Sequence, residues 1–170
     1  IPVEVIEKAF DEVVHSNPMS LLQYGPMQGD ARLAELTLKR LVKTHKMNPE
    51  GQGLIISNGA GQLLGLVPIT VLEPGDEVYM DEFTFTSAIN SVRNMGGKAL
   101  GIKTDEHGMI PSELEKAAQS GKGKYIYLIP NFQNPTGITM PLERRKEIYA
   151  IASKYDLFIY EDDPYGEIRF

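Results

Sequence analysis

The 170-residue sequence contains no cysteine. This absence excludes disulfides, thiolate nucleophiles and zinc sites built on cysteine. Histidine is scarce, since the chain has only His15, His45 and His107. These three lack the close spacing of metal ligands, and we expect all of them to be solvated. The sequence therefore predicts no metal site.

An excess of basic charge is also missing. The 17 lysines and arginines are outnumbered by 23 aspartates and glutamates, which gives a formal net charge of −6. Such a chain has no electrostatic attraction to nucleic acid or to an anionic membrane. The longest apolar runs, such as Leu63–Leu72, are too short to span a bilayer. No apolar or arginine-rich leader opens the sequence as given, from which targeting cannot be read. We expect no nucleic-acid partner, no membrane partner and a cytoplasmic location.

The residues that are present suit a folded domain. Hydrophobic residues make up 42% and charged residues 24% of the chain, which is typical of globular proteins. Residues 1–15 have the apolar period of a helix. A turn-rich passage follows, and Asp30 can cap a second helix that ends near the basic residues Lys43 and Lys46.

From residue 51 onward, short apolar runs alternate with helical stretches. The expected strands are residues 54–57, 77–81, 99–103, 124–129 and 157–160. The expected helices are residues 61–72, 84–94, 111–119 and 141–155. This alternation predicts an α/β fold with a parallel sheet covered by helices on both faces. Ligands of such sheets bind beyond the carboxyl ends of the strands.

A glycine-rich turn, Ser57-Asn58-Gly59-Ala60-Gly61-Gln62, joins the first expected strand to a helix. Backbone amides of such a turn and the positive end of the helix favour a phosphate group. The absence of a Gly-Lys-Ser/Thr ending excludes a nucleoside-triphosphatase loop. A turn without a ligand is one alternative. A dinucleotide site is another, because Gly59, Gly61, Gly65 and Asp81 resemble a loosened fingerprint for it.

Two later strands are also followed by polar residues. Asn134 precedes Pro135, which disfavours the helical conformation and lets the Asn134 amide point into the crevice. A simple β-turn around Gly137 is the alternative. After the last strand, the sequence Glu-Asp-Asp-Pro-Tyr could supply a carboxylate for a protonated ring nitrogen and a phenol donor from Tyr165. The alternatives for these acidic residues are that they bind magnesium or that they are charged residues of an exposed loop.

Taken in order, SNGAGQ, DEFTF, NPTG and EDDPY resemble the fold-type I, class I/II pyridoxal-phosphate-dependent aminotransferases. The similarity is closest to the 2-aminoadipate, kynurenine and aromatic aminotransferase group, and the segment LQYGPMQGDARLAEL is similar to one near the start of that group. The resemblance implies a three-layer α/β sandwich without its last strands and C-terminal small domain. Residues 1–50 would form N-terminal helices and a dimer-contacting segment, and residues 51–170 the first part of the large, cofactor-binding domain.

The resemblance implies pyridoxal 5'-phosphate as cofactor and a homodimer. The backbone amides of Ala60 and Gly61, after Gly59, would hold the phosphate. Tyr24 would reach the phosphate of the partner subunit. The group commonly has hydroxyl or amide side chains where Ala60 and Gly61 stand, so the phosphate contacts would come from the backbone alone.

The same resemblance assigns residues to the cofactor ring. Phe85 would lie against the pyridine ring, at a position where the group commonly has tyrosine. Asn134 and Tyr165 would hold the ring hydroxyl oxygen. Asp162 would face the protonated ring nitrogen. Its neighbour Asp163 would point elsewhere.

The implied activity is transfer of an amino group from an amino acid to a 2-oxo acid. The Schiff-base lysine and the carboxylate-binding arginine are expected beyond Phe170, so the catalytic residues are unknown and the 170 residues alone are expected to be inactive. Another fold-type I enzyme, such as a carbon–sulfur lyase or a decarboxylase, is an alternative. So is the aminotransferase-like domain of a transcription regulator, although such domains tend to have EDDYD. A nicotinamide-dependent dehydrogenase would leave NPTG and EDDPY without a role.

Overall fold

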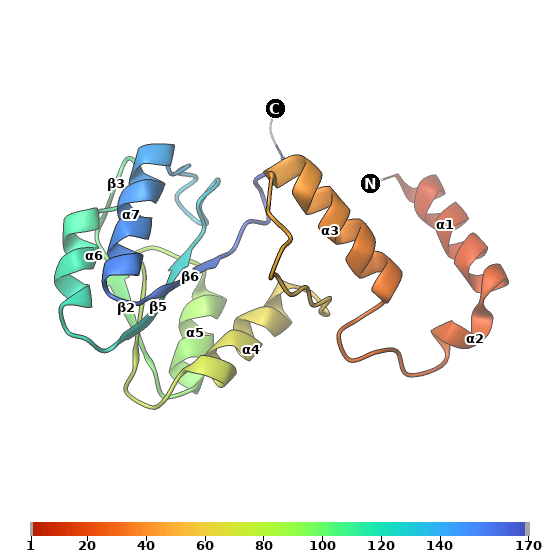
Figure 1. Ribbon diagram of the computed structural model, residues 1–170, viewed down its shortest axis with the longest axis horizontal. Coiled ribbons are helices and arrows are strands. Elements are labelled where there is room, and N and C mark those ends of the chain that lie inside the picture. The colour runs from red at the N-terminus through yellow and green to blue at the C-terminus, as the bar shows by residue number, and fades with distance from the viewer. Residues whose placement is uncertain (1, 169–170) are drawn as a thin grey trace. The chain divides into compact units, whose positions relative to one another are not determined.

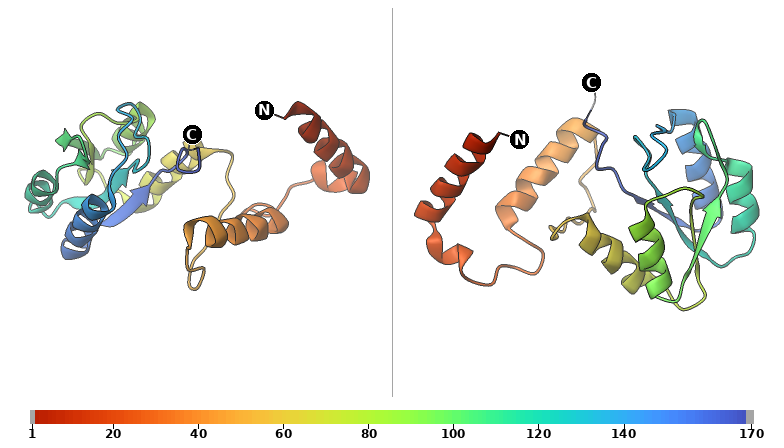
Figure 2. Two further views of the ribbon diagram at one scale, coloured as in Figure 1. Left: turned by 90° about the horizontal axis from the view of Figure 1, so that it is seen from above. Right: turned by 180° about the vertical axis from the view of Figure 1, so that it is seen from behind.

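The computed structural model describes residues 2–168, and the chain forms two compact units that divide between Asn58 and Gly59. Figure 1 and Figure 2 show the helices and strands of each unit. The functional division at residue 50 stays a prediction. The two units are described separately below.

The N-terminal unit consists of helices and loops. Its helices are α1 (Val3–Ser16), α2 (Pro18–Leu21) and α3 (Ala31–His45). Asp30 caps α3 as expected, because its side chain accepts a hydrogen bond from the Leu33 amide at 2.8 Å. Apolar residues of α1, Phe10 among them, are exposed within this chain.

The strand expected at residues 54–57 does not form, so that prediction was wrong. Ile56 donates one backbone hydrogen bond to Gln28 (3.0 Å) instead of joining a ladder. Gly29 has a φ of +93°, and a side chain there would clash with Ile56. An apolar run becomes a strand only when a neighbour pairs with it. The described sheets contain no neighbour for this segment.

The C-terminal unit is built on a four-stranded parallel sheet in the order β2-β1-β5-β6. Its strands are β1 (Glu77–Asp81), β2 (Lys98–Ile102), β5 (Gly123–Leu128) and β6 (Phe158–Glu161). The first and last residues of each strand differ by at most one position from those of a predicted strand. A two-stranded hairpin, β3 (Thr104–Asp105) with β4 (Gly108–Met109), follows β2.

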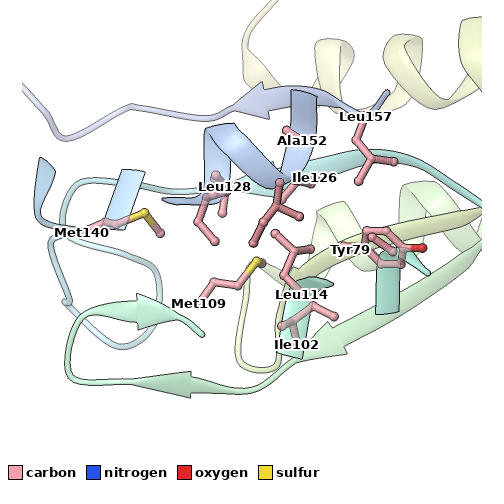
Figure 3. Packing of buried hydrophobic residues seen from close by; sticks show 12 residues of the cluster. Tyr79, Ile102, Met109, Leu114, Ile126, Leu128, Met140, Ala152 and Leu157 are labelled. Atoms are coloured by element: carbon pink, nitrogen blue, oxygen red, sulfur yellow. The ribbon is translucent and has the colours of Figure 1, made fainter. Parts of the chain in front are cut away.

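Helices cover both faces of this sheet (Figure 1). One face carries α4 (Ala60–Val71) and α5 (Thr86–Asn94), and the other carries α6 (Pro111–Ala118) and α7 (Leu142–Lys154). Side chains alternate along each strand, so Val78 and Met80 pack toward α4 and α5 whereas Tyr79 packs toward α6 and α7. Figure 3 shows the core beneath α6 and α7, where Ile126 and Leu114 pack together. The predicted α/β sandwich with a parallel sheet is confirmed.

The direction of the helices determines which segments meet. In strand–helix–strand connections the helices run antiparallel to the strands. The C-terminal end of α4 lies near that of α5, since the space around Gly97 is filled by Leu72 and Val92. The N-termini of α4 and α5 therefore lie at the carboxyl edge of the sheet. The segments that follow β5 and β6 begin at the same edge.

Candidate functional site

The carboxyl edge of the sheet gathers four of the predicted segments. These are the start of α4 with Gly59, the loop after β1 with Phe85, the turn after β5 with Asn134, and the segment after β6 with Asp162. The topology thus brings together residues that are about a hundred positions apart in the sequence. Open parallel sheets bind ligands at this edge.

The start of α4 offers backbone donors. Gly59 is the N-cap residue, with a φ of +86°, and it has no side chain to cap the helix. A β-carbon at Gly59 or Gly61 would meet no atom within 4 Å, so the space in front of these residues is open within the unit. Ala60 and Gly61 are exposed at the positive end of a twelve-residue helix. This arrangement suits an anion such as a phosphate.

Phe85 lies at the N-cap position of α5. Its side chain is 36% exposed, and it belongs to neither hydrophobic cluster of the unit. The ring is therefore available to a ligand rather than buried between helix and sheet. This placement fits the predicted stacking role without testing it.

Asn134 lies in the turn that follows β5. The side chain is half-buried, and the Asn134–Pro135 peptide bond is cis. Gly137 has a φ of +75°, as predicted, but its amide donates to the Gln133 carbonyl at 2.6 Å, which closes a five-residue α-turn rather than the predicted four-residue β-turn. A glycine-dependent turn therefore carries Asn134 at the edge of the sheet, and contact of its amide with a ligand stays a prediction.

Arg145 of α7 holds the base of this turn. Its guanidinium donates to the carbonyls of Met140 (2.9 Å) and Pro130 (3.1 Å) and to the side chain of Asn131 (2.9 Å). Met140 also donates its amide to the Pro130 carbonyl at 2.9 Å. The two ends of the segment from Pro130 to Met140 are thus joined, and the NPTG motif lies between them.

Asp162 is half-buried at the end of β6. The Tyr127 phenol donates to its Oδ2 atom at 2.7 Å. Burial, and then this hydrogen bond, raises the pKa of Tyr127, so the phenol remains the donor. The Asp162 amide donates to the Leu128 carbonyl at 2.8 Å, which continues the pairing of β5 and β6. Both backbone and side chain therefore hold this carboxylate at the carboxyl edge.

No lysine or arginine within the described residues forms an ion pair with Asp162. The neighbouring carboxylate, Asp163, has a buried Oδ1 atom that accepts no hydrogen bond from the part of the chain described here. Tyr165 is 36% exposed, three residues after Asp162. The segment after β6 therefore presents a carboxylate supported by a neutral phenol, followed by an accessible tyrosine.

Tyr24 belongs to the N-terminal unit, and its side chain is fully exposed. Its contact with the phosphate of a partner subunit stays a prediction. Among residues 2–168, no helix is both apolar enough and long enough to cross a membrane. Groups of three metal-ligating side chains are likewise absent from that range.

Sequence reasoning missed two residues that support the site. Tyr127 is fully buried in β5 and bonds to Asp162 across 35 positions of sequence. Gln133 is buried and connects the turn after β5 to the loop after β1, since its Nε2 atom donates to the Phe83 carbonyl at 2.6 Å. In the sequence, the only indication of a role for Gln133 is its position immediately before Asn134. For Tyr127 the sequence shows only a place in an apolar strand.

Asp81 was the carboxylate of the dinucleotide alternative. It is only 4% exposed, so it lacks the accessibility that ribose binding requires. The strand that should precede the glycine turn in a dinucleotide fold is also absent from the described sheets. The structure thus leaves the glycines without the strand and the accessible carboxylate that a dinucleotide site needs.

Comparison with known proteins agrees with this geometry. The aromatic-amino-acid aminotransferase 1 of Thermococcus litoralis is 31% identical over 99% of this chain and 42% of its own length. The mitochondrial kynurenine/alpha-aminoadipate aminotransferase of Mus musculus is 34% identical over 88% of this chain and 39% of its own length. The chain spans less than half the length of these relatives.

Solved structures show the same likeness. The kynurenine aminotransferase of Pyrococcus horikoshii, crystallised with PMP, superposes with a TM-score of 0.94 at 33% identity, covering 100% of this chain and 43% of that one. The alpha-aminoadipate aminotransferase of Thermus thermophilus, complexed with N-(5'-phosphopyridoxyl)-L-leucine, gives a TM-score of 0.85 at 29% identity with the same coverage. The family model for aminotransferase class I and II matches residues 2–170. The chain therefore belongs to the class I and II aminotransferase family.

Proposed function

We propose that the whole protein is an amino-acid aminotransferase that uses pyridoxal 5'-phosphate to transfer an amino group from an amino acid to a 2-oxo acid. The observation that carries this proposal is the supported carboxylate Asp162, which lies at the same sheet edge as the glycine-rich N-terminus of α4. Relatives of this chain were crystallised with PMP and with a phosphopyridoxyl amino acid. The donor set at this edge fits such a group.

The phosphate end fits the start of α4. Ala60 and Gly61 would donate backbone amides, and Gly59 leaves the approach free of a side chain. The helix contributes about half a positive charge at this end, which favours a dianionic group. This contact requires no particular side chain, so alanine and glycine are suitable residues at these positions.

The ring end fits the residues after the strands. Asp162 would hold a protonated pyridine nitrogen, because a nearby carboxylate favours the charged form of that nitrogen. Phe85 would stack on the ring, which contributes on the order of 1 kcal/mol beyond the burial of its area. Asn134 and Tyr165 would donate to the ring hydroxyl oxygen. When bound, the cofactor supplies an electron sink for the electron pair released at the α-carbon of an amino acid.

The residues described here would bind and orient the cofactor. The lysine that would hold the cofactor covalently and move the α-proton is expected beyond Phe170. We further propose a homodimer in which Tyr24 contributes to the partner's phosphate site; the exposed apolar residues of the N-terminal unit, such as Phe10 and Leu22, suit such a contact. We also propose a cytoplasmic location, which cell fractionation tests.

The experiment uses the purified whole protein. It is titrated with pyridoxal 5'-phosphate, and binding is followed by absorbance. The loaded protein then receives aromatic amino acids, kynurenine or 2-aminoadipate together with 2-oxoglutarate, and the products are separated and identified. Formation of glutamate supports the proposal. Binding without transfer, with release of carbon dioxide, would identify a decarboxylase. A parallel assay with cysteine, in which sulfide is released without transfer, would identify a carbon–sulfur lyase. Absence of binding would refute the proposal.

A further inference from the structure

The side chain of Gln133 connects two loops at the carboxyl edge. Its Nε2 atom donates to the Phe83 carbonyl at 2.6 Å. Its Oε1 atom accepts from the Thr136 amide at 2.9 Å and from the Thr136 hydroxyl at 2.6 Å. A single buried amide therefore joins the loop after β1 to the turn after β5.

This connection continues the sheet beyond its last backbone pair. The ladder between β1 and β5 ends at Met80 paired with Tyr127. The loops that follow have no ladder to set their separation. Gln133 fixes the separation of the two loops, since it hydrogen-bonds to the main chain of one loop at Phe83 and of the other at Thr136.

Residues proposed to hold the ring lie next to both anchor points. Phe85 is two residues after Phe83, and Asn134 is the residue after Gln133. A change in the distance between the loops would move the stacking ring relative to the amide that holds the ring oxygen. Sites that bind a rigid planar group are sensitive to shifts of this kind.

We propose that Gln133 is a positioning residue that sets the spacing between Phe85 and Asn134 and thereby the affinity for the cofactor ring. This inference rests on the proposed function. An amide is required at this position because the partner on the β1 side is an acceptor, the Phe83 carbonyl, whereas the Thr136 side consists of donors. An ionised carboxylate, which only accepts, cannot serve both sides.

The test compares Gln133→Glu with the matched control Gln119→Glu, an exposed position at the end of α6. Glutamate preserves the size of the side chain and removes its donors. The affinities of the whole protein for pyridoxal 5'-phosphate and for inorganic phosphate are measured separately by titration. Gln133 is expected to affect the ring end and to leave the start of α4 unchanged.

We expect Gln133→Glu to bind pyridoxal 5'-phosphate at least about tenfold more weakly, which corresponds to about 1.4 kcal/mol, while its affinity for inorganic phosphate stays the same. Hydrogen exchange without cofactor should accelerate in both loops, residues 82–86 and 131–138, and not in α6. The Gln119→Glu control should match the wild type in every measurement. General loss of structure would instead lower the affinity for pyridoxal 5'-phosphate and the affinity for inorganic phosphate together.

A milder variant, Thr136→Val, tests the inference if Gln133→Glu does not fold. It removes the hydroxyl donor of an exposed residue and should weaken cofactor binding about threefold, again without an effect on phosphate. Equal cofactor affinity in wild type and variant, or a parallel loss of phosphate affinity, would overturn the inference alone. A wild-type protein that binds no pyridoxal 5'-phosphate would overturn the proposed function and the inference together.

Discussion

Replacing Asp81 with asparagine should remove a pH-dependent cost of folding. Asp81 is 4% exposed, and its Oδ1 atom accepts no hydrogen bond within the described residues. Its pKa is raised from 3.8 to about 6, mainly by burial; a hydrogen bond from Gln133 opposes the rise and the charge of Glu82 adds to it. The folded state therefore favours the protonated acid.

The sign and size of the effect follow from that shift. Ionised Asp81 destabilises the folded state, so the cost grows as the pH rises from about 4 and is complete above the folded-state pKa of about 6. A shift of roughly two pKa units corresponds to about 3 kcal/mol in total. Between pH 5 and pH 8, the wild type should lose about 1 to 1.5 kcal/mol relative to Asp81→Asn.

Denaturant unfolding at about pH 5, 6.5 and 8 measures this difference. Asp11→Asn, at an exposed position of α1, is the matched control and should show no such trend. A difference between wild type and Asp81→Asn that stays constant with pH would refute the reasoning. So would a wild type that gains stability relative to the variant as the pH rises, because that would mean that the folded state favours the ionised form.

Four further predictions concern the cofactor site. Asp162→Ala in the whole protein should lower turnover by several orders of magnitude, because it leaves the ring cation without its partner. Asp163→Ala should lower turnover far less, and equal losses of turnover in a steady-state assay would contradict the assignment. Tyr127→Phe removes the hydrogen bond to Asp162 and should weaken cofactor affinity by roughly fivefold to tenfold, as read by titration. Phe85→Ala should shorten cofactor retention during dialysis, while Phe85→Tyr should be tolerated. The 170-residue chain treated with pyridoxal 5'-phosphate and borohydride should show no single labelled lysine by mass spectrometry.

The sequence located the sheet well because its strands carry a strong signal. Strands buried on both faces appear as short apolar runs, and the runs at residues 77–81 and 124–129 correspond closely to β1 and β5. The run at residues 54–57 looked the same and did not form a strand. Apolar character is a property of the segment itself, whereas a ladder also needs a partner. No local pattern could distinguish the two cases.

Some residues of the candidate site could likewise be proposed from the sequence, and others could not. Gly59, Asn134 and Asp162 could be proposed from the sequence because each follows an expected strand or turn and has a chemical type that suits a ligand. Gln133 and Tyr127 were missed because their function depends on partners that are distant in sequence, Phe83 and Asp162 respectively. Only the fold shows that these side chains reach across the sheet edge.

The choice of partner for Asp162 bears on its proposed role. Several other carboxylates of the unit are paired with cations, as in the bond between Arg144 and Asp105 at 3.0 Å. Asp162 instead accepts from the neutral phenol of Tyr127, and no lysine or arginine of residues 2–168 neutralises it. A phenol orients the carboxylate without cancelling its charge. The full negative charge therefore stays available to a cation brought by the ligand, which is what a protonated pyridine nitrogen requires.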